Sequence, residues 1–189
     1  RWRVGVTAAY TITDYLENVQ NDGTRFSIGP TAFYQLSQFI TLNAAVAFTS
    51  SSFDQTGTIG DTSAFTGVTY SGSINHTINK HTAHSLQVSK TASGGVGSNF
   101  TESLMVQYAL NTRFASAFSL NVTVAYDHYS TSSAAGESGN RFLGFVGTTV
   151  DLTRHWTAGI GFAAAMKDSD LPGRDYFQNR LTLDLARHF

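Results

Sequence analysis

The sequence predicts an all-β fold: an antiparallel up-and-down transmembrane β-barrel, about ten strands in this chain, with short periplasmic turns and longer extracellular loops. Three observations predict it. Apolar and polar residues alternate in segment after segment, which is the period of a β-strand. The chain is 41% hydrophobic but only 13% charged, about half of the roughly 25% typical of soluble domains. Short and long connections follow one another, as in transmembrane barrels.

The alternation starts at the first residues and returns until the chain ends. Even positions from Trp2 to Ile12 are apolar and the residues between them are small or polar. The same pattern recurs at 26–36, 40–48, 68–78, 86–88, 104–110, 118–126, 156–166 and 181–185. The stretch 142–152 is ambiguous, because Leu143 and Phe145 interrupt the period. Segments of roughly nine to thirteen residues have the length that a tilted strand needs to cross hydrocarbon.

Two kinds of connection separate these segments. Short turns are expected near 37–38, 79–81, 112–116 and 153–155. Longer loops rich in Gly, Ser and Asp are expected near 17–24, 51–64, 93–98, 131–140 and 168–175. Because the short turns of such barrels are periplasmic, an even strand count places both termini in the periplasm.

Composition excludes several classes of protein. The net charge is −1 and no basic run is present, so no nucleic-acid partner is expected. The absence of Cys excludes disulfides and thiolate metal sites. A soluble β-sandwich would also alternate, but its water-facing side would carry many Lys and Glu, whereas the polar face here is small and neutral. The whole chain, 1–189, is expected to form a single transmembrane barrel domain.

The polar face is predicted to line the lumen. Its residues are Arg3, Thr7, Arg25, Ser27, Thr41, Asn43, Ser73, Asn75, Gln87, Ser103, Gln107, Asn121, Thr123, Asp127, Lys167, Gln178, Arg180 and Asp184. Such a neutral, hydrogen-bonding wall suits water and neutral sugars, although these groups could also bond only to one another and to trapped water. Eight strands leave an interior filled by side chains, so about ten strands closing alone predict a narrow or occluded pore. Small residues widen one sector: Gly159, Gly161, Ala163 and Ala165.

A hairpin centred on 94–97 predicts a pair of charges on the outward face. In that register Lys90 faces Glu102 and Leu86 faces Val106. The simpler interpretation is a cross-strand ion pair, and the functional one is a contact between Lys90 and a lipopolysaccharide phosphate.

The other polar clusters do not predict a metal site or a catalytic site. Asp168, Asp170 and Asp175 could suggest Ca²⁺, but their spacing fits no EF-hand, and a solvated turn with Asp caps is favoured. His128 neighbours Asp127, yet alternation points the two in opposite directions, so no catalytic pair is expected there. The remaining histidines fall on the periplasmic side: His76, His81, His84, His155 and His188. Neither an enzyme activity nor a metal or cofactor is therefore expected.

Aromatic residues recur at the outward ends of strands. They are Trp2, Tyr10, Tyr34, Tyr70, Tyr108, Tyr126 and Trp156. Trp and Tyr at these places are typical of the two aromatic girdles at the membrane interfaces.

The C-terminus resembles the signal that the barrel-assembly machinery reads on outer-membrane proteins. Leu181, Leu183, Leu185 and the terminal Phe189 match its alternating hydrophobics and final aromatic. Arg187 departs, since that outward position is usually apolar or Tyr, but an Arg at the interface can snorkel.

Three stretches carry a more specific resemblance: "NHTINKHTAHSLQVSK" (75–90), "LTRHWTAGIGF" (152–162) and "DSDLPGRDYFQNRLTLDL" (168–185). They are similar to a family of outer-membrane β-barrel porins found with exopolysaccharide biosynthesis and export genes. The resemblance implies the outer membrane of a Gram-negative envelope, with lipid, lipopolysaccharide, the barrel-assembly machinery and polysaccharide-export or other envelope proteins as partners. Members are typically longer, so the chain is either the C-terminal part of a larger barrel or a shortened relative.

Two functions remain open. The first is a passive channel or export-associated pore for saccharide or exopolysaccharide. The second is a non-conducting barrel that anchors or scaffolds an envelope complex. A barrel enzyme would need an Asp and a His that converge at the outer rim.

Overall fold

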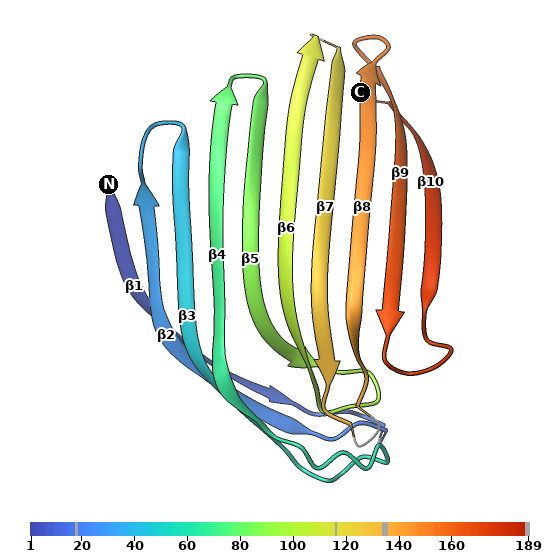
Figure 1. Cartoon of the computed structure of the whole chain (residues 1–189). Helices are drawn as coiled ribbons and strands as arrows, with labels where there is room; N and C mark the ends of the chain where they lie inside the picture. The colour runs from blue at the N-terminus through green and yellow to red at the C-terminus, as the bar shows by residue number, and fades with distance from the viewer. Residues whose placement is uncertain (18, 116, 134–135, 188–189) are drawn as a thin grey trace.

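A computed structural model describes residues 1–17, 19–115, 117–133 and 136–187, and it shows one curved antiparallel sheet with ten strands in chain order (Figure 1). The strands are β1 (Trp2–Thr13), β2 (Gly23–Gln35), β3 (Ile40–Phe53), β4 (Phe65–Asn79), β5 (Thr82–Gly94), β6 (Phe100–Ala115), β7 (Phe118–Thr131), β8 (Ser138–Asp151), β9 (Trp156–Ser169) and β10 (Tyr176–Arg187). The all-β class, the strand count and the up-and-down order predicted from the sequence are confirmed. Four strands have 12 or 13 residues, within the expected nine to thirteen, and the other six are longer, with 14 to 16 residues.

Short turns and long loops lie at opposite ends of the sheet. In Figure 1 both termini lie at the upper end, with the short turns, and the long loops gather at the lower end. Several short turns are held by a side-chain oxygen of an early turn residue. Ser37 Oγ accepts the backbone N–H of Ile40 at 3.1 Å, and Asn79 Oδ1 accepts that of His81 at 2.8 Å. These local bonds explain why Ser and Asn occur at the two turns.

Apart from register shifts near the short turns, at 77–79 of β4 and 113–115 of β6, the register keeps neighbouring side chains on the same face from β1 to β10. The outer face is apolar and open, with Val4 79% and Leu183 72% exposed. The apolar rows therefore do not pack against one another, as they would in a sandwich. No helix within 1–17, 19–115, 117–133 or 136–187 is long and apolar enough to cross a membrane.

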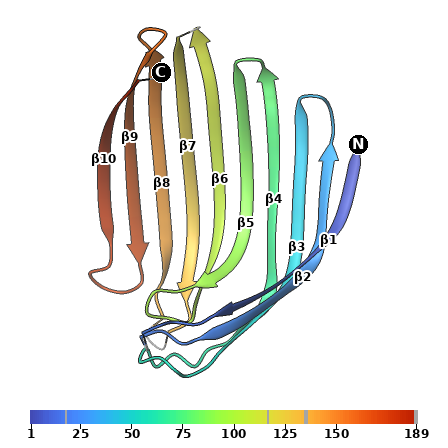
Figure 2. The same ribbon diagram turned by 180° about the vertical axis from the view of Figure 1, so that it is seen from behind.

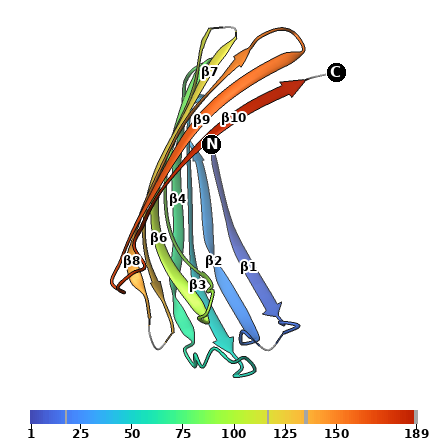
Figure 3. The same ribbon diagram turned by 90° about the vertical axis from the view of Figure 1, so that its right-hand side faces the viewer.

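The sheet is curved but open. Among the described residues, β1 pairs only with β2 and β10 only with β9. The curvature, visible from the side in Figure 3, does not bring the two edges into pairing distance, so the closed barrel remains a prediction. Bending is strongest at the long-loop end, where the lower parts of β1 to β4 pass beneath the neighbouring strands (Figures 1 and 2).

Gly29 permits part of this bending. A Cβ at Gly29 would lie 1.9 Å from the carbonyl oxygen of Val46 on β3. Only a residue without a side chain can approach the neighbouring backbone so closely. Pro30, next in β2, has no N–H to donate, and the direct pairing of β2 with β3 is interrupted at these two positions.

Candidate functional site on the concave face

All residues predicted to line a lumen lie on one face of the sheet. The register places Arg3 beside Phe33 on β2 and Asp184 beside Gly159 on β9, and the pairings between these two edges keep the predicted residues on the same side. Two hollows, described below, open on this face. We therefore call it the concave face and the opposite one the outer face. The predicted girdle aromatics lie on the opposite face, where Trp2 stacks on Tyr34 with ring centroids 4.3 Å apart.

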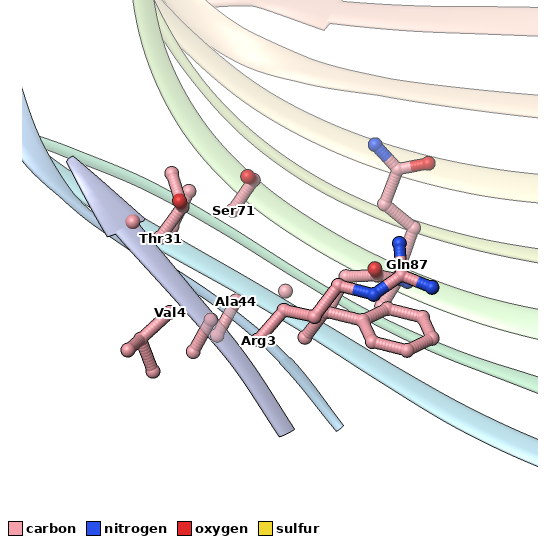
Figure 4. A pocket seen from close by; sticks show the side chains of 13 residues that line it. Arg3, Val4, Thr31, Ala44, Ser71 and Gln87 are labelled. Atoms are coloured by element: carbon pink, nitrogen blue, oxygen red, sulfur yellow. The ribbon is translucent and has the colours of Figure 1, made fainter. Parts of the chain in front are cut away.

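The larger hollow, about 460 Å³, lies over β1 to β5. Arg3 extends into it from β1 and Gln87 lines it from β5, whereas Val4 points away on the other side of β1 (Figure 4). The Arg3 guanidinium lies 5.1 Å from the centre of the Phe33 ring, a cation–π contact. This hollow is lined mainly by small and neutral polar groups, including Asn43 and Ser73, which hydrogen-bond each other at 3.2 Å.

A second hollow of about 440 Å³ lies over β7 to β10. It is lined in part by Leu143 and Phe145, which both point to the concave side. These are the two residues that interrupt the alternation in the stretch 142–152. The tip of the Phe145 ring occupies the space that a Cβ at Gly147 or Gly161 would need, 2.6 and 3.0 Å away. The small residues of β9 thus do not simply widen the interior, because Phe145 fills part of the space they leave.

Charged side chains form a row across β7 to β9. Asp127 accepts hydrogen bonds from Ser103 on β6 and from Arg141 on β8, the Arg141 Nε bond measuring 2.8 Å. Tyr129 is buried between two cations, with Arg141 and Lys167 lying 4.7 and 5.5 Å from its ring centre. Asp127 and Lys167 were predicted for this face. Arg141 was not predicted for this face, although its alternation with the apolar Phe142 could have indicated the face on which it lies.

Glu137 joins this row to the loops. Its carboxylate accepts bonds from Lys167 at 2.5 Å, Tyr129 Oη at 2.7 Å, Ser169 Oγ at 2.8 Å and Arg174 Nη1 at 2.9 Å. Burial alone would raise the pKa of Glu137, but these donors outweigh it and hold the pKa well below its usual range. The sequence assigned Glu137 to a loop, and no periodic signal marks it.

A second polar network ties the long loops together. Asp61 is only 2% exposed, and its carboxylate accepts the Asn99 N–H at 2.7 Å, the Ser132 hydroxyl at 2.5 Å and the Ser63 N–H at 2.9 Å. The Asn21 amide donates to the Asp61 carbonyl at 2.7 Å and to Asn99 Oδ1 at 2.8 Å. Segments from four different loops therefore meet around Asp61.

The predicted ion pair is present, but the predicted register was wrong. Lys90 Nζ lies 3.2 Å from Glu102 Oε2 on the outer face. Directly opposite pairs are Lys90 with Leu104 and Ala92 with Glu102, so the two charges meet diagonally. The turn of the β5–β6 hairpin is centred later in the chain than predicted, around Gly97. Its φ of 71° is a conformation that glycine adopts readily.

The acidic loop forms a turn. Asp170 Oδ1 accepts the Ser138 N–H at 2.9 Å and Asp175 Oδ1 accepts the Ser169 N–H at 2.7 Å. These bonds agree with the cap interpretation. Within the described ranges, no group of three or more His, Cys, Asp and Glu residues could hold a metal ion.

His128 lies on the face that the alternation predicts. His128 Nδ1 lies 3.1 Å from Asn140 Oδ1 on the outer face, while Asp127 points to the concave side, so the two diverge. His76 Nδ1 and His84 Nε2 lie 3.0 Å apart near a short turn.

The assembly-signal residues lie on the last strand. Leu181, Leu183 and Leu185 share the outer face of β10, and the Arg187 guanidinium lies 5.8 Å from the Trp156 ring centre. Phe189 and His188 lie outside the described residues. Comparison with known proteins does not assign the chain to a family, because no family model and no curated protein matches it.

Proposed function

We propose that this chain forms an outer-membrane β-barrel that acts as a passive channel or export-associated pore for saccharides. The observation that carries the proposal is the division of one sheet into two faces. The outer face exposes large apolar side chains along every strand, which water-soluble monomers rarely do over so large an area. The concave face carries hydrogen-bonding groups around its hollows.

Details of the outer face support a bilayer as its solvent. Aromatic pairs lie near both ends of the strands: Trp2 stacks on Tyr34 towards the short turns, and Tyr126 contacts Phe142 towards the long loops, with ring centroids 5.0 Å apart. Tyr126 Oη donates to Asn140 at 2.7 Å, so its polar end is satisfied while its ring covers apolar surface. This is the behaviour expected of an interfacial aromatic.

The concave wall favours neutral, hydroxylated cargo over ions. Two of its carboxylates, Asp127 and Glu137, are paired with cations, which weakens the negative field along this part of the wall. Saccharide hydroxyls can exchange hydrogen bonds with the Asn, Ser, Thr and Gln side chains that dominate elsewhere. We propose no catalytic role, since Asp127 and His128 point to opposite faces of the sheet.

Planar-bilayer recording tests the channel. The purified chain, refolded into detergent and shown to be β-rich by circular dichroism, should produce discrete conductance steps that a neutral oligosaccharide reduces. Heat-denatured protein serves as the control. Folded protein that inserts into vesicles and stays silent would contradict the channel, and folded protein that does not associate with vesicles would contradict the membrane location as well.

A scaffold is the second candidate, and the loop network favours it. The bonds around Asp61 hold several loops together at one end of the sheet, and such an arrangement would restrict passage. Silent insertion combined with protease-resistant loops would support this function over the channel.

A further inference from the structure

A pocket distinct from the two open hollows lies at the long-loop end. Its volume is about 130 Å³, smaller than the roughly 300–1,000 Å³ of pockets for drug-sized ligands. It is enclosed from several directions, because β1, β2 and β3 form one side and the tip of the β5–β6 hairpin forms another. The residues used below are Thr11, Tyr15, Arg25, Phe53, Ser93 and Phe100.

Arg25 is a half-buried cation without a carboxylate partner among the residues that the structure describes. Its Nε donates to Ser51 Oγ at 3.2 Å, and no ion pair involves it. Two other cations of this face have carboxylate partners, Arg141 with Asp127 and Lys167 with Glu137, and Arg3 instead covers the Phe33 ring. A guanidinium has five N–H donors, and an uncompensated charge in a partly dry site is costly. The terminal amino groups of Arg25 therefore have capacity to bind an anion.

Two carboxylates of the loops around this pocket, those of Asp22 and Asp61, are already engaged. Asp22 Oδ1 accepts the Tyr15 N–H at 2.8 Å, and both oxygens of Asp61 serve the loop network. The bond from Asp22 also fixes the backbone of Tyr15, whose hydroxyl would lie 3.9 Å from a Cβ at Gly94 on β5. The Tyr15 hydroxyl is thus held at the pocket as a second donor.

The remaining lining is part apolar and part hydroxylic. The rings of Phe53 and Phe100 lie 20° from parallel with centroids 6.5 Å apart, and they form an apolar wall. Thr11 and Ser93 add hydroxyl groups. A ligand that fits has one negative charge for Arg25, hydroxyls for these groups and a ring with an apolar face.

We propose that this pocket binds a small organic carboxylate, specifically a single sugar acid. The carboxylate meets the Arg25 guanidinium, the Tyr15 hydroxyl donates to a ligand oxygen, and the sugar ring lies against Phe53 and Phe100. The proposal does not require that the barrel conducts, so binding can be measured on folded protein in detergent.

Calorimetric titration with glucuronate tests the proposal, with glucose as the neutral probe of the same ring size. Glucuronate should bind at least about tenfold more tightly than glucose, because a hydrogen bond between charged groups is the stronger kind. Arg25→Gln keeps a polar group near Ser51 while removing the charge, and it should abolish the difference between the two sugars. Tyr15→Phe removes only the hydroxyl and should weaken glucuronate binding severalfold.

Arg3→Gln is the matched control, because Arg3 lies on the same face in the other hollow, covering Phe33; its glucuronate affinity should equal that of the native protein. Circular dichroism checks that each variant is folded. The proposal is overturned if native protein binds neither sugar, if it binds both equally, or if folded Arg25→Gln retains the preference for glucuronate. None of these outcomes depends on conductance, so the binding proposal and the channel proposal can be refuted independently.

Discussion

The buried carboxylate of Asp61 gives the sharpest stability prediction. Asp61→Asn keeps the shape of the side chain but replaces one acceptor oxygen with an NH₂ group. Oδ2 accepts two bonds, from Asn99 N–H and Ser132 Oγ–H, and Oδ1 accepts one, from Ser63 N–H. The amide will place its nitrogen where fewer bonds are lost, at the Oδ1 position, so that two N–H groups face each other.

The magnitude follows from these bonds. A hydrogen bond to a charged group contributes about 1.5–3 kcal/mol, and an unsatisfied buried donor costs about 1–3 kcal/mol. Because the Asn can reorient in part, we expect Asp61→Asn to lower the free energy of unfolding by about 2–4 kcal/mol. Denaturant titration of protein refolded in detergent or lipid measures the change. Hydrogen exchange should accelerate in the segments that Asp61 joins, around Asn21, Asn99 and Ser132.

The pH dependence has a definite sign. Burial tends to raise the pKa of Asp61, but the bonds from Asn99, Ser132 and Ser63 outweigh burial and lower it. A carboxyl group whose pKa is lower in the folded state stabilises the fold fully above its unfolded pKa, about 3.9. That stabilisation is lost as the pH falls through the folded pKa. Native protein should therefore lose more stability than Asp61→Asn on acidification below about pH 4.

Asp54→Asn is the control, since Asp54 is an exposed residue of the same loop. It should leave both stability and loop exchange unchanged. The reasoning is refuted if Asp61→Asn matches native protein in denaturant titration, or if its loops exchange no faster than those of the control.

Three further predictions concern other parts of the sheet. A double-mutant cycle on Lys90 and Glu102, whose side chains are 38% and 34% exposed, should give a coupling below about 1 kcal/mol that falls with added salt; a coupling that ignores salt would contradict a surface pair. Glu137→Gln leaves Lys167 without its carboxylate partner and should cost roughly 3–5 kcal/mol in denaturant titration, and a loss below 1 kcal/mol would be inconsistent with a buried pair. Leu183→Arg on the outer face should destabilise protein folded in lipid by about 2–4 kcal/mol, and no loss in lipid would argue that water, not hydrocarbon, meets this face.

Strand positions and faces could be predicted because both depend on local alternation. A period of two places each residue on a face once its neighbours are known, so Arg3 at one edge and Asp184 at the other were correctly assigned to the same side. Leu143 and Phe145 broke the pattern because the concave side admits an aromatic ring where Gly147 and Gly161 leave room. A tertiary compensation of this kind leaves no periodic signal within one strand.

Register and loop contacts depend on geometry that the alternation does not encode. A shift of the 94–97 turn by one residue moves every partner by two and keeps the faces unchanged, so the pattern could not distinguish Glu102 from Leu104 opposite Lys90. The networks at Asp61 and Glu137 join residues far apart in the chain. Their composition resembles that of any polar loop, and only the folded sheet brings their donors and acceptors together.

The free edges connect the fold to the proposed function. Every residue of β1 is exposed, as are nearly all of β10, and one side of each strand has backbone N–H and C=O groups without ladder partners. Water can satisfy these groups, but hydrocarbon cannot, and each unsatisfied group there costs several kcal/mol. If the apolar face meets lipid, as proposed, then β1 and β10 must each acquire a strand partner on insertion. The width of the lumen is set by what supplies those partners, because pairing the two edges with each other yields a narrow barrel and additional strands yield a wider one.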